Sequence, residues 1–298
     1  MSTVRLTMAQ ALVRYLLNQY TVVDGKEVPL FPGIFGIFGH GNVTCLSEAL
    51  EAVKDTFPTW RGQNEQSMAL AAIAFAKAKR RRQIMVATSS TGPGTTNMVT
   101  AAGGETMKNW RCKTTNSYDL EFGFSCMGCE IAGGWGAKMA VPSRDVIVMV
   151  GDGSYMLMNS DIYSSVLTGH KLIIIVCDNG GYTVINRLQQ FKGTPGFNNL
   201  LKECKTAIPP FSVDFVKHAE SMGAMARKVS SLAELEQAMD WAKRNDRTTV
   251  ISIVTDAYTW TPDDALWDVG VPQVSDRTAV QEQQKYQVDV RAKQRVGV

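Results

Sequence analysis

Residues 146–182 read VIVMVGDGSYMLMNSDIYSSVLTGHKLIIIVCDNGGY. Two short apolar runs in this stretch, Val146–Val150 and Leu172–Cys177, each end in a small polar cluster. Runs of this length that are rich in Val and Ile predict strands buried on both faces of a parallel sheet. Between them, Tyr155–Thr168 has apolar residues near helical spacing, which predicts a helix. We therefore expect a strand–helix–strand unit whose polar clusters lie at the carboxyl ends of neighbouring strands, where open α/β sheets bind ligands.

The two polar clusters, Gly151-Asp152-Gly153-Ser154 and Asp178-Asn179-Gly180-Gly181, offer groups that suit a metal-bound phosphate. Asp152 offers a carboxylate and Asn179 an amide oxygen, and the glycines let the backbone approach closely. Ser154 and the first amides of the helix can hold an anion. Mg²⁺ bridging to a diphosphate is the natural occupant, because Mg²⁺ takes one or two protein oxygens and completes its shell with phosphate and water. Taken alone, the clusters also suit ordinary turns, which favour the same residue types.

Composition limits the class of protein. At 298 residues the chain has room for about two domains, and 45% hydrophobic with 20% charged residues is typical of a globular protein. The one dense basic run, Lys79–Arg82, lacks interleaved aromatic residues, which favours a helix C-terminus over a nucleic-acid partner. No apolar run approaches the ~20 residues that span a bilayer, so no membrane partner is expected. Cys126 and Cys129 form a lone C-x-x-C. Because no second pair lies nearby, we expect no zinc site and interpret the cysteines as reduced, in a cytoplasmic protein.

The rest of the chain alternates between helical and strand patterns, which predicts an α/β fold. We expect a loop over residues 21–32 and a tail helix within 262–298. Helices are expected over Thr7–Tyr20, Ser47–Thr56, Asn64–Arg80, Phe211–Met222 and Ser231–Arg244. Strands are expected over Gly33–Phe38, Ile84–Ala87, Ala224–Val229 and Thr248–Thr255. Ser231 is a candidate helix N-cap, and Gly133, Gly134 and Gly136 fit the close packing of a helix on a sheet.

Two independent sets of motifs identify the chain as similar to a known family. The GDG of residues 151–153 and the Asp178-Asn179 pair are separated by the 24 residues Ser154–Cys177, and together they resemble the thiamine diphosphate (ThDP) signature. Upstream, W-R-G-Q-N-E-Q-S-M-A-L-A-A from Trp60 and T-S-S-T-G-P-G-T-T-N-M from Thr88 resemble the pyrimidine-binding domain of ThDP enzymes.

The resemblance implies the ThDP-binding fold, in which two doubly wound parallel-sheet domains of a homo-oligomer bind ThDP and Mg²⁺. Residues 1–102 would be the pyrimidine-binding domain, 103–261 the domain that binds diphosphate and Mg²⁺, and 262–298 a C-terminal tail. Family members are longer and carry a central domain, which we expect to be missing here at a seam near Thr100–Gly104. Both remaining domains would then be incomplete and would leave open sheet edges.

The same resemblance implies roles for individual residues. Mg²⁺ would be bound by Asp152, the side chain of Asn179 and the backbone carbonyl of Gly181. Glu65 would hydrogen-bond a ring nitrogen of the aminopyrimidine, and the imino tautomer that results would remove the thiazolium proton. His40 would line the catalytic cavity. The implied cofactor-binding residues are Glu65, Met127, Gly151, Asp152, Gly153, Ser154, Asn179, Gly181 and Tyr182.

Three of these residues also have ordinary structural explanations. A carboxylate at Glu65 would stabilise the N-terminus of the expected helix. His40 stands in a Gly-rich loop, where a histidine often serves only the turn. Met127, which by resemblance would hold the cofactor bent, could equally belong to the core.

Further strings are similar to one branch of the family, the trihydroxycyclohexanedione hydrolases of inositol catabolism. They are F-G-I-F-G-H-G-N, G-F-S-C-M-G, D-V-I-V-M-V-G-D-G-S-Y and I-N-R-L-Q-Q. This resemblance implies hydrolytic C–C cleavage of a small cyclic polyol dione to 5-deoxyglucuronate. Two alternatives stay open: a carboligase or decarboxylase of the acetolactate synthase type, and a shortened chain that binds ThDP without turnover.

Overall fold

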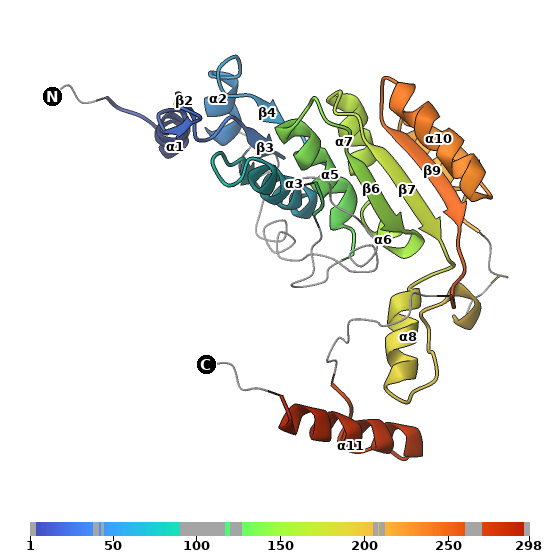
Figure 1. The fold of residues 1–298 in the computed structure, drawn as a ribbon. Coiled ribbons are helices and arrows are strands. Elements are labelled where there is room, and N and C mark those ends of the chain that lie inside the picture. The colour runs from blue at the N-terminus through green and yellow to red at the C-terminus, as the bar shows by residue number, and fades with distance from the viewer. Residues whose placement is uncertain are drawn as a thin grey trace. The chain divides into compact units, whose positions relative to one another are not determined.

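The computed structural model describes residues 4–37, 42, 45–89, 117–119, 127–204, 208, 212–259 and 270–294. The chain divides into two compact units, and each is described by itself. Unit one comprises Met1–Val150, Ser154–Val176 and Asp214–Ile253, and unit two comprises Gly151–Gly153, Cys177–Val213 and Val254–Val298. Figure 1 labels the helices and strands.

The first half of the chain supplies unit one with a hairpin and a three-stranded sheet. The sheet has the order β4-β3-β5, and both of its strand pairs are parallel. In chain order the elements are α1 (Met8–Leu17), β1 (Tyr20–Val23), β2 (Lys26–Pro29), β3 (Ile34–Gly36), α2 (Cys45–Glu51), β4 (Thr59–Trp60), α3 (Glu65–Ala78) and β5 (Val86–Thr88). Their core consists of the buried residues Val13, Leu16, Ile34, Ala49, Leu50 and Phe57.

The segment 21–32, expected as a loop, contains most of a β-hairpin. Strands β1 and β2 pair antiparallel, with Val23 opposite Lys26. Asp24 and Gly25 join the strands with φ of 51° and 78°. A two-residue hairpin turn requires these left-handed conformations, and an Asp-Gly pair adopts them readily. The expectation of a loop over residues 21–32 was wrong, because the Asp24-Gly25 pair forms the turn between two paired strands.

The second half forms a four-stranded sheet of order β6-β7-β9-β8 with helices around it. Its elements are α5 (Cys129–Ala140), β6 (Ile147–Gly151), α6 (Asp152–Leu157), α7 (Asp161–Leu167), β7 (Ile173–Asp178), α9 (Phe215–Ser221), β8 (Met225–Val229), α10 (Leu232–Arg244) and β9 (Thr249–Val254). The β8–β9 pair is parallel, and β6, β7 and β9 point the same way in Figure 1. The expected N-cap of α10 is present, since the Ser231 hydroxyl accepts from the Glu234 N–H at 3.2 Å. The predicted α/β fold is confirmed.

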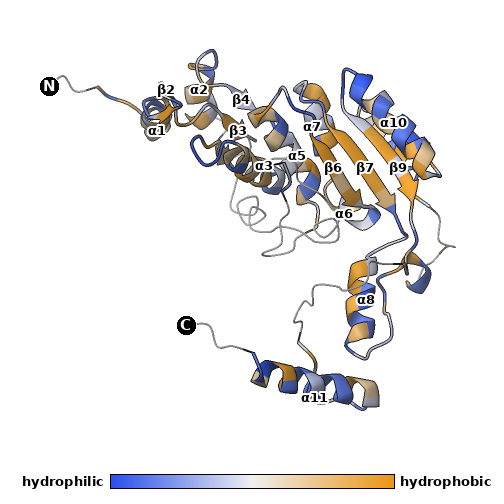
Figure 2. Ribbon diagram, in the orientation of Figure 1, coloured by the Kyte–Doolittle hydropathy of each residue, from blue (hydrophilic) through white to orange (hydrophobic). Residues whose placement is uncertain are grey.

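Strands β6 and β7, expected to be equally buried, differ. Residues 173–176 of β7 are all buried, and Figure 2 shows this strand as apolar. In β6, however, Ile147 and Met149 are 38% and 40% exposed and alternate with buried Val148 and Val150. Strand β6 stands at one end of the sheet order, where only one strand neighbours it. Among the described residues no further strand pairs with β6 on its other side.

The segment Tyr155–Thr168, expected as one helix, contains the end of α6 and the whole of α7. The two helices are separated at Asn159, whose side-chain amide donates to the Tyr155 carbonyl at 3.1 Å. That bond occupies a carbonyl that a continuous helix would pair with the backbone N–H of residue 159. The apolar spacing continued across this break and did not reveal it.

Helices α3 and α5, which come from the two halves of the chain, pack against each other within unit one. A Cβ atom on Gly136 would collide with the backbone of Ala71, so glycine allows this close approach. A Cβ atom on Gly134 would instead collide with Val148 of β6, as expected for a helix on a sheet. Phe35 and Trp135 add a ring contact between the halves, with centroids 5.1 Å apart.

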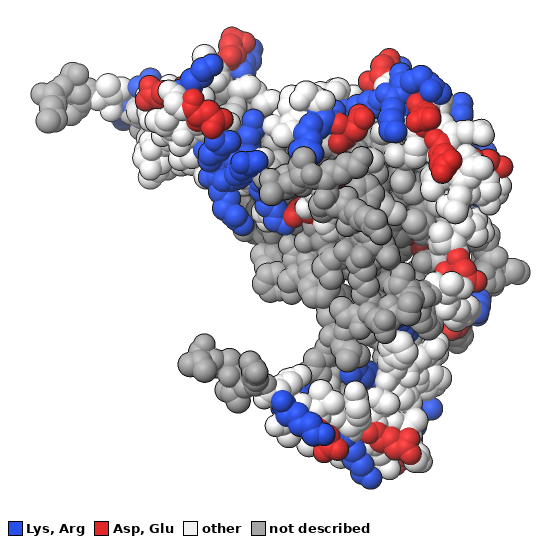
Figure 3. Space-filling view, viewed as in Figure 1, with Lys and Arg blue, Asp and Glu red and all other residues white. Residues whose placement is uncertain are grey.

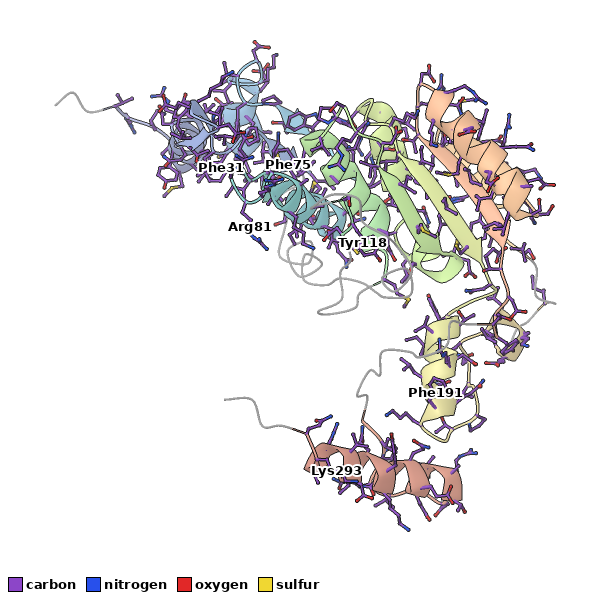
Figure 4. The ribbon with its side chains drawn as sticks, viewed as in Figure 1. Phe31, Phe75, Arg81, Tyr118, Phe191 and Lys293 are labelled. Carbon is purple, nitrogen blue, oxygen red and sulfur yellow. The ribbon has the colours of Figure 1, made fainter. Side chains whose placement is uncertain are left out.

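The basic run Lys79–Arg82 follows the end of α3 directly, as predicted. Arg80 and Arg81 have left-handed φ of 53° and 57°, and the Arg81 N–H donates to the Ala76 carbonyl at 2.7 Å. This bond satisfies one of the last carbonyls of the helix. Arg81 is exposed in Figure 4, and Figure 3 shows Lys and Arg side chains gathered over this part of the surface.

Unit two contains two longer helices, α8 (Thr183–Phe191) and α11 (Thr278–Ala292), and the short 3-10 helix η2 (Leu201–Glu203). Helix α11 is the expected tail helix, whereas α8 was not anticipated. The Arg187 guanidinium lies 5.2 Å from the centre of the Phe191 ring, which Figure 4 labels on α8. Within the described residues, no helix combines the length and the apolar character needed to cross a membrane.

Candidate functional site

The Asp152 carboxylate lies at the carboxyl end of β6, in unit two, and is only 6% exposed. Burial raises its pKa, and the neighbouring carboxylate of Asp178 raises it further. Backbone N–H groups of Asn179, Gly153 and Gly181 donate to Asp152 and lower its pKa, but less than burial raises it. The structure therefore brings both polar clusters of the sequence together around one buried carboxylate.

The Asn179 side chain and the Gly181 carbonyl lie beside this carboxylate. The Asn179 side chain donates from Nδ2 to Thr183 Oγ1 at 3.1 Å. Its Oδ1 then lies 3.1 Å from Asp152 Oδ1 and 2.9 Å from the Gly181 carbonyl oxygen, with no donor between them. If the amide is turned, its nitrogen donates to both oxygens and Thr183 Oγ1 donates to its oxygen. The turned orientation thus satisfies every partner of the Asn179 side chain by hydrogen bonds, whereas the other places its oxygen beside two further oxygens.

The backbone at Gly180 and Gly181 holds the carbonyl in this place. Both glycines have positive φ, 80° and 138°. The Tyr182 N–H donates to the Asn199 carbonyl at 2.9 Å, and the Leu201 N–H donates to the Gly180 carbonyl at 2.9 Å. A Cβ atom on Gly181 would collide with the Asn199 carbonyl. Glycine is needed at position 181 for both its φ and this approach.

Two further features of unit two complete this part of the site. The Tyr182 ring lies against Gly153, where a Cβ atom would collide with it. Next to Asn179 there is a cavity of about 270 Å³. Its walls are formed by Asn179, Gly180, Leu200, Leu201, Lys202, Ser212 and Ala257.

Met127 and Ser154 belong to unit one, where a second carboxyl group joins them. Glu130 accepts from the Gly128 N–H at 2.8 Å and from the Ser154 hydroxyl. Burial raises the pKa of Glu130 in spite of these bonds. The Met127 side chain is 37% exposed, so it is not part of the core. Sequence reasoning missed Glu130, because a glutamate in the first turn of a helix is ordinary.

Glu65 is the first residue of α3, in unit one, and is 8% exposed. Asn64 caps the helix, and its side-chain oxygen accepts from the Ser67 N–H at 2.9 Å. The turn that precedes Glu65 contacts α7, where Gln63 Nε2 donates to Ser164 Oγ at 3.3 Å. The buried carboxylate expected at this helix start is therefore present.

Some of the predicted features lie outside the described residues. They are His40 with the glycines beside it, the seam near Thr100–Gly104, and Cys126. Over the part of the chain that is described, no group of three or more His, Cys, Asp and Glu side chains could hold a metal ion. Any cation at Asp152 would there be held by one carboxylate together with amide and backbone oxygens.

Comparison with known proteins gives a family match and several relatives. The family model described as thiamine pyrophosphate enzyme, C-terminal TPP binding domain, matches residues 98–253. The 3D-(3,5/4)-trihydroxycyclohexane-1,2-dione hydrolase of Geobacillus thermodenitrificans is 37% identical over 184 residues, which are 60% of this chain and 29% of that protein. The Bacillus subtilis protein of the same name is 34% identical over 184 residues, covering 60% of this chain and 28% of its own length.

The chain thus spans under a third of the length of these curated relatives. Among solved structures, a thiamine diphosphate-dependent 4-hydroxybenzoylformate decarboxylase from Rhodococcus jostii RHA1 has a TM-score of 0.38 and 24% sequence identity. That match covers 44% of this chain and 23% of the other.

Proposed function

Since the chain belongs to the thiamine pyrophosphate enzyme family, whose C-terminal domain matches residues 98–253, we propose that it binds ThDP together with Mg²⁺. We further propose that it takes part in the hydrolytic C–C cleavage of a cyclic polyol dione, within a homo-oligomer in the cytoplasm. The relatives named trihydroxycyclohexanedione hydrolases support this choice of reaction. Because they are more than three times as long as the matched part, the substrate is part of the proposal.

The observation that carries the Mg²⁺ assignment is the convergence of the Asn179 side-chain amide, the Asp152 carboxylate and the Gly181 carbonyl, in which the amide oxygen would face the metal. Mg²⁺ binds oxygen octahedrally at about 2.0–2.1 Å, which places neighbouring ligand oxygens about 3 Å apart. The oxygen separations of 3.1 and 2.9 Å fit two such edges. One carboxylate with two neutral oxygens also leaves positions for phosphate and water, as Mg²⁺ prefers.

The hydrogen-bonded orientation of Asn179 accounts for the metal-free state. Thr183 Oγ1 is a hydroxyl, so it can accept from the amide nitrogen or donate to the amide oxygen at the same 3.1 Å. We assign the orientation with three converging oxygens to the metal-bound state and the turned one to the metal-free state. A half-turn of one amide then prepares the site for Mg²⁺ without moving the backbone.

The remaining residues act on the organic part of the cofactor and on the substrate. When bound, ThDP supplies the nucleophilic carbon that attacks a ring ketone. Glu65 would hold a proton at the aminopyrimidine ring, and Ser154 would bind the diphosphate by its hydroxyl. Met127, which is partly exposed, would support the bent cofactor. His40, which lies outside the described residues, stays a prediction for proton transfer or substrate binding.

One different function has a specific observation in its favour. The open β6 edge, with Ile147 and Met149 partly exposed, is a place where another chain could associate. The chain would in that case bind ThDP, or join full-length partners, without turnover of its own. The acetolactate synthase type of reaction has no comparable support.

Calorimetric titration of the purified chain with ThDP, with and without Mg²⁺, tests the proposal. We expect saturable binding that requires Mg²⁺, followed by product formation from the cyclic dione and none from pyruvate. Binding without turnover would favour the non-enzymatic alternative. Absence of binding by a folded chain would rule out the proposed cofactor site.

A further inference from the structure

We propose that Asp161 is a positioning residue for Glu65: its buried carboxyl group, together with Ser164, holds the turn from which Glu65 starts. This inference rests on the proposed function, which gives Glu65 its task at the cofactor. It adds a residue that was not expected from the sequence motifs and that does not touch the metal site.

The Asp161 side chain is completely buried at the start of α7. It accepts from the Ser164 hydroxyl at 2.7 Å and from the backbone N–H of Gln63. The Gln63 side chain in turn donates to Ser164 Oγ at 3.3 Å. The backbone N–H and the side-chain amide of Gln63 thus both bond this pair on α7, although residues 63 and 161 come from different halves of the chain.

The second oxygen of the carboxyl group, Oδ2, concerns Ser67, which lies in the first turn of α3. Asp161 Oδ2 and Ser67 Oγ are both buried without a hydrogen-bonding partner. The Ser67 hydroxyl nevertheless lowers the pKa of Asp161, which shows that it lies close to this carboxyl group. Buried polar atoms without partners are unfavourable and rare in folded proteins. Two of them together indicate a pair that bonds after a slight shift, since the Ser67 hydroxyl can donate to a carboxylate oxygen.

Burial raises the pKa of Asp161 above its ordinary value and so favours the protonated form of its carboxyl group. In the protonated form Oδ2 becomes a donor, for which Ser67 Oγ is the nearby acceptor. The groups that oppose the shift are the Ser67 and Ser164 hydroxyls and the Gln63 N–H, all of them uncharged. Asp161 is therefore a bridge that can bond Gln63 and Ser67 at once, with Ser67 as the acceptor from the protonated form or as the donor to the ionised one.

Gln63 and Ser67 stand two residues before and two residues after Glu65. A group that holds both of them fixes the start of α3, and with it the direction in which the Glu65 side chain leaves the helix. The body of α3 is held separately, by its packing on α5 at Gly136. Displacing a reacting group by about 1 Å can lower a rate roughly 100-fold, so control of this turn matters for proton transfer.

The test compares Asp161→Ala and Asp161→Asn with Ser165→Ala as the matched control. Ser165 is equally buried on α7, but its hydroxyl bonds Thr248, at 2.7 Å, and not the Gln63–Ser67 turn. Two quantities are measured: amide hydrogen exchange over 63–67, and the exchange rate of the thiazolium C2 proton of added ThDP in the presence of Mg²⁺. Because Asp161→Ala opens a hole, Ser164→Ala provides a milder variant, which removes the 2.7 Å bond to Asp161 and the 3.3 Å bond from Gln63 but keeps the buried carboxyl group.

In Asp161→Ala and Ser164→Ala we expect faster amide exchange over 63–67, by about 10-fold or more, with other helices unchanged. Cofactor proton exchange should slow by about 10- to 100-fold, while ThDP affinity stays within about threefold of wild type. Asp161→Asn keeps an acceptor and gains a donor toward Ser67, so it should rescue both quantities. Ser165→Ala should change neither.

Three outcomes decide the fate of this inference, and they separate it from the proposed function. If wild type does not bind ThDP, the proposed function fails, and amide exchange alone decides: selective loss of protection over 63–67 supports the bridge. If Asp161→Ala and Ser164→Ala match Ser165→Ala in amide exchange, the bridge is overturned whether or not ThDP binds. If the variants lose amide protection over 63–67 but keep the wild-type rate of C2 proton exchange, Asp161 holds the turn without positioning Glu65, and the proposal is overturned.

Discussion

Gly136 of α5 lies directly against the main chain of Ala71 in α3, and a Cβ atom on Gly136 would collide with the Ala71 carbonyl group. The collision is with backbone, which cannot turn aside as a long side chain can. The two helices belong to the two halves of the chain, so at this contact the halves of unit one meet without a side chain on Gly136 between them. Any added group at position 136 must push α3 and α5 apart.

We expect Gly136→Ala to lower the free energy of unfolding by about 1–3 kcal/mol, since overpacking a close contact forces the backbone to shift. Gly133→Ala is the control on the same helix, because its new methyl group would meet only the Ala74 Cβ atom, at 3.9 Å. It should be neutral, or stabilising by up to ~1 kcal/mol, because alanine is the better helix former. Urea unfolding of the two variants checks this, and equal effects would contradict the close approach.

Removing the Asp152 carboxylate should abolish Mg²⁺-dependent binding of ThDP. Asp152 carries the only charge among the three converging groups, and Asp152→Ala leaves just the Asn179 side chain and the Gly181 carbonyl. Asp246→Ala removes an exposed carboxylate that pairs only with its neighbour Arg247, at 3.4 Å, and should bind as wild type does. Calorimetric titration at several Mg²⁺ concentrations measures both, and retained Mg²⁺-dependent binding by Asp152→Ala would remove the metal assignment.

Gly180 and Gly181 allow a second, independent test of the same loop. Both have positive φ, so alanine at either position costs about 1–2 kcal/mol in backbone strain. Only at position 181 does the new Cβ atom also collide with the Asn199 carbonyl. Gly181→Ala should therefore destabilise the protein more than Gly180→Ala in thermal unfolding, and it should weaken Mg²⁺ binding by displacing its own carbonyl. Similar effects of the two variants on stability would argue against the close approach at Asn199.

The strands and their polar ends followed from the sequence, because local patterns determine them. The apolar runs before Gly151 and Asp178 are strands, and Asp152 and Asn179 do meet at their ends. The Ser231 cap could be foreseen for the same reason, since it depends only on residues within one turn. The hairpin at Asp24-Gly25 was equally local, and the Asp-Gly signal was available but not used.

Tertiary burial could not be foreseen in the same way. Glu130 and Asp161 each stand in the first turn of a helix, where acidic residues are common on exposed surfaces. Only the packing of the surrounding elements buries them and raises their pKa. Of three nearby glycines, Gly136 alone faces the Ala71 backbone, and no spacing within α5 distinguishes it from Gly133.

If Glu65 acts on the aminopyrimidine, Glu65→Gln should stop turnover and leave ThDP affinity within about threefold of wild type, because the amide keeps the size of the side chain but cannot take up a proton. Glu48→Gln is the control, since Glu48 also lies in the first turn of a helix but is exposed. Product analysis with the cyclic dione and calorimetry with ThDP measure the two effects. Loss of ThDP binding in Glu65→Gln, with Glu48→Gln unaffected, would show that Glu65 supports binding and not proton transfer.

The buried carboxyl group of Asp161 should make stability depend on pH in a way that Asp161→Asn removes. Burial raises its pKa above the ordinary value of 3.8, so the folded chain holds the proton at pH values where the unfolded chain has lost it. The contribution of Asp161 to stability is therefore complete below about pH 4 and is lost as pH rises through the raised pKa of the folded state.

Asparagine does not titrate, so the free energy of unfolding of Asp161→Asn minus that of wild type should increase from pH 4 upward. Its slope can reach about 1.4 kcal/mol per pH unit within the window and falls to zero above the raised pKa. Taking the difference cancels the titration of Glu130, which both proteins share. Urea unfolding at half-unit steps between pH 4 and pH 8 measures it. A difference that stays constant over this range would mean that Asp161 is ionised in the folded chain, and a bridge in which Asp161 donates to Ser67 would then be wrong.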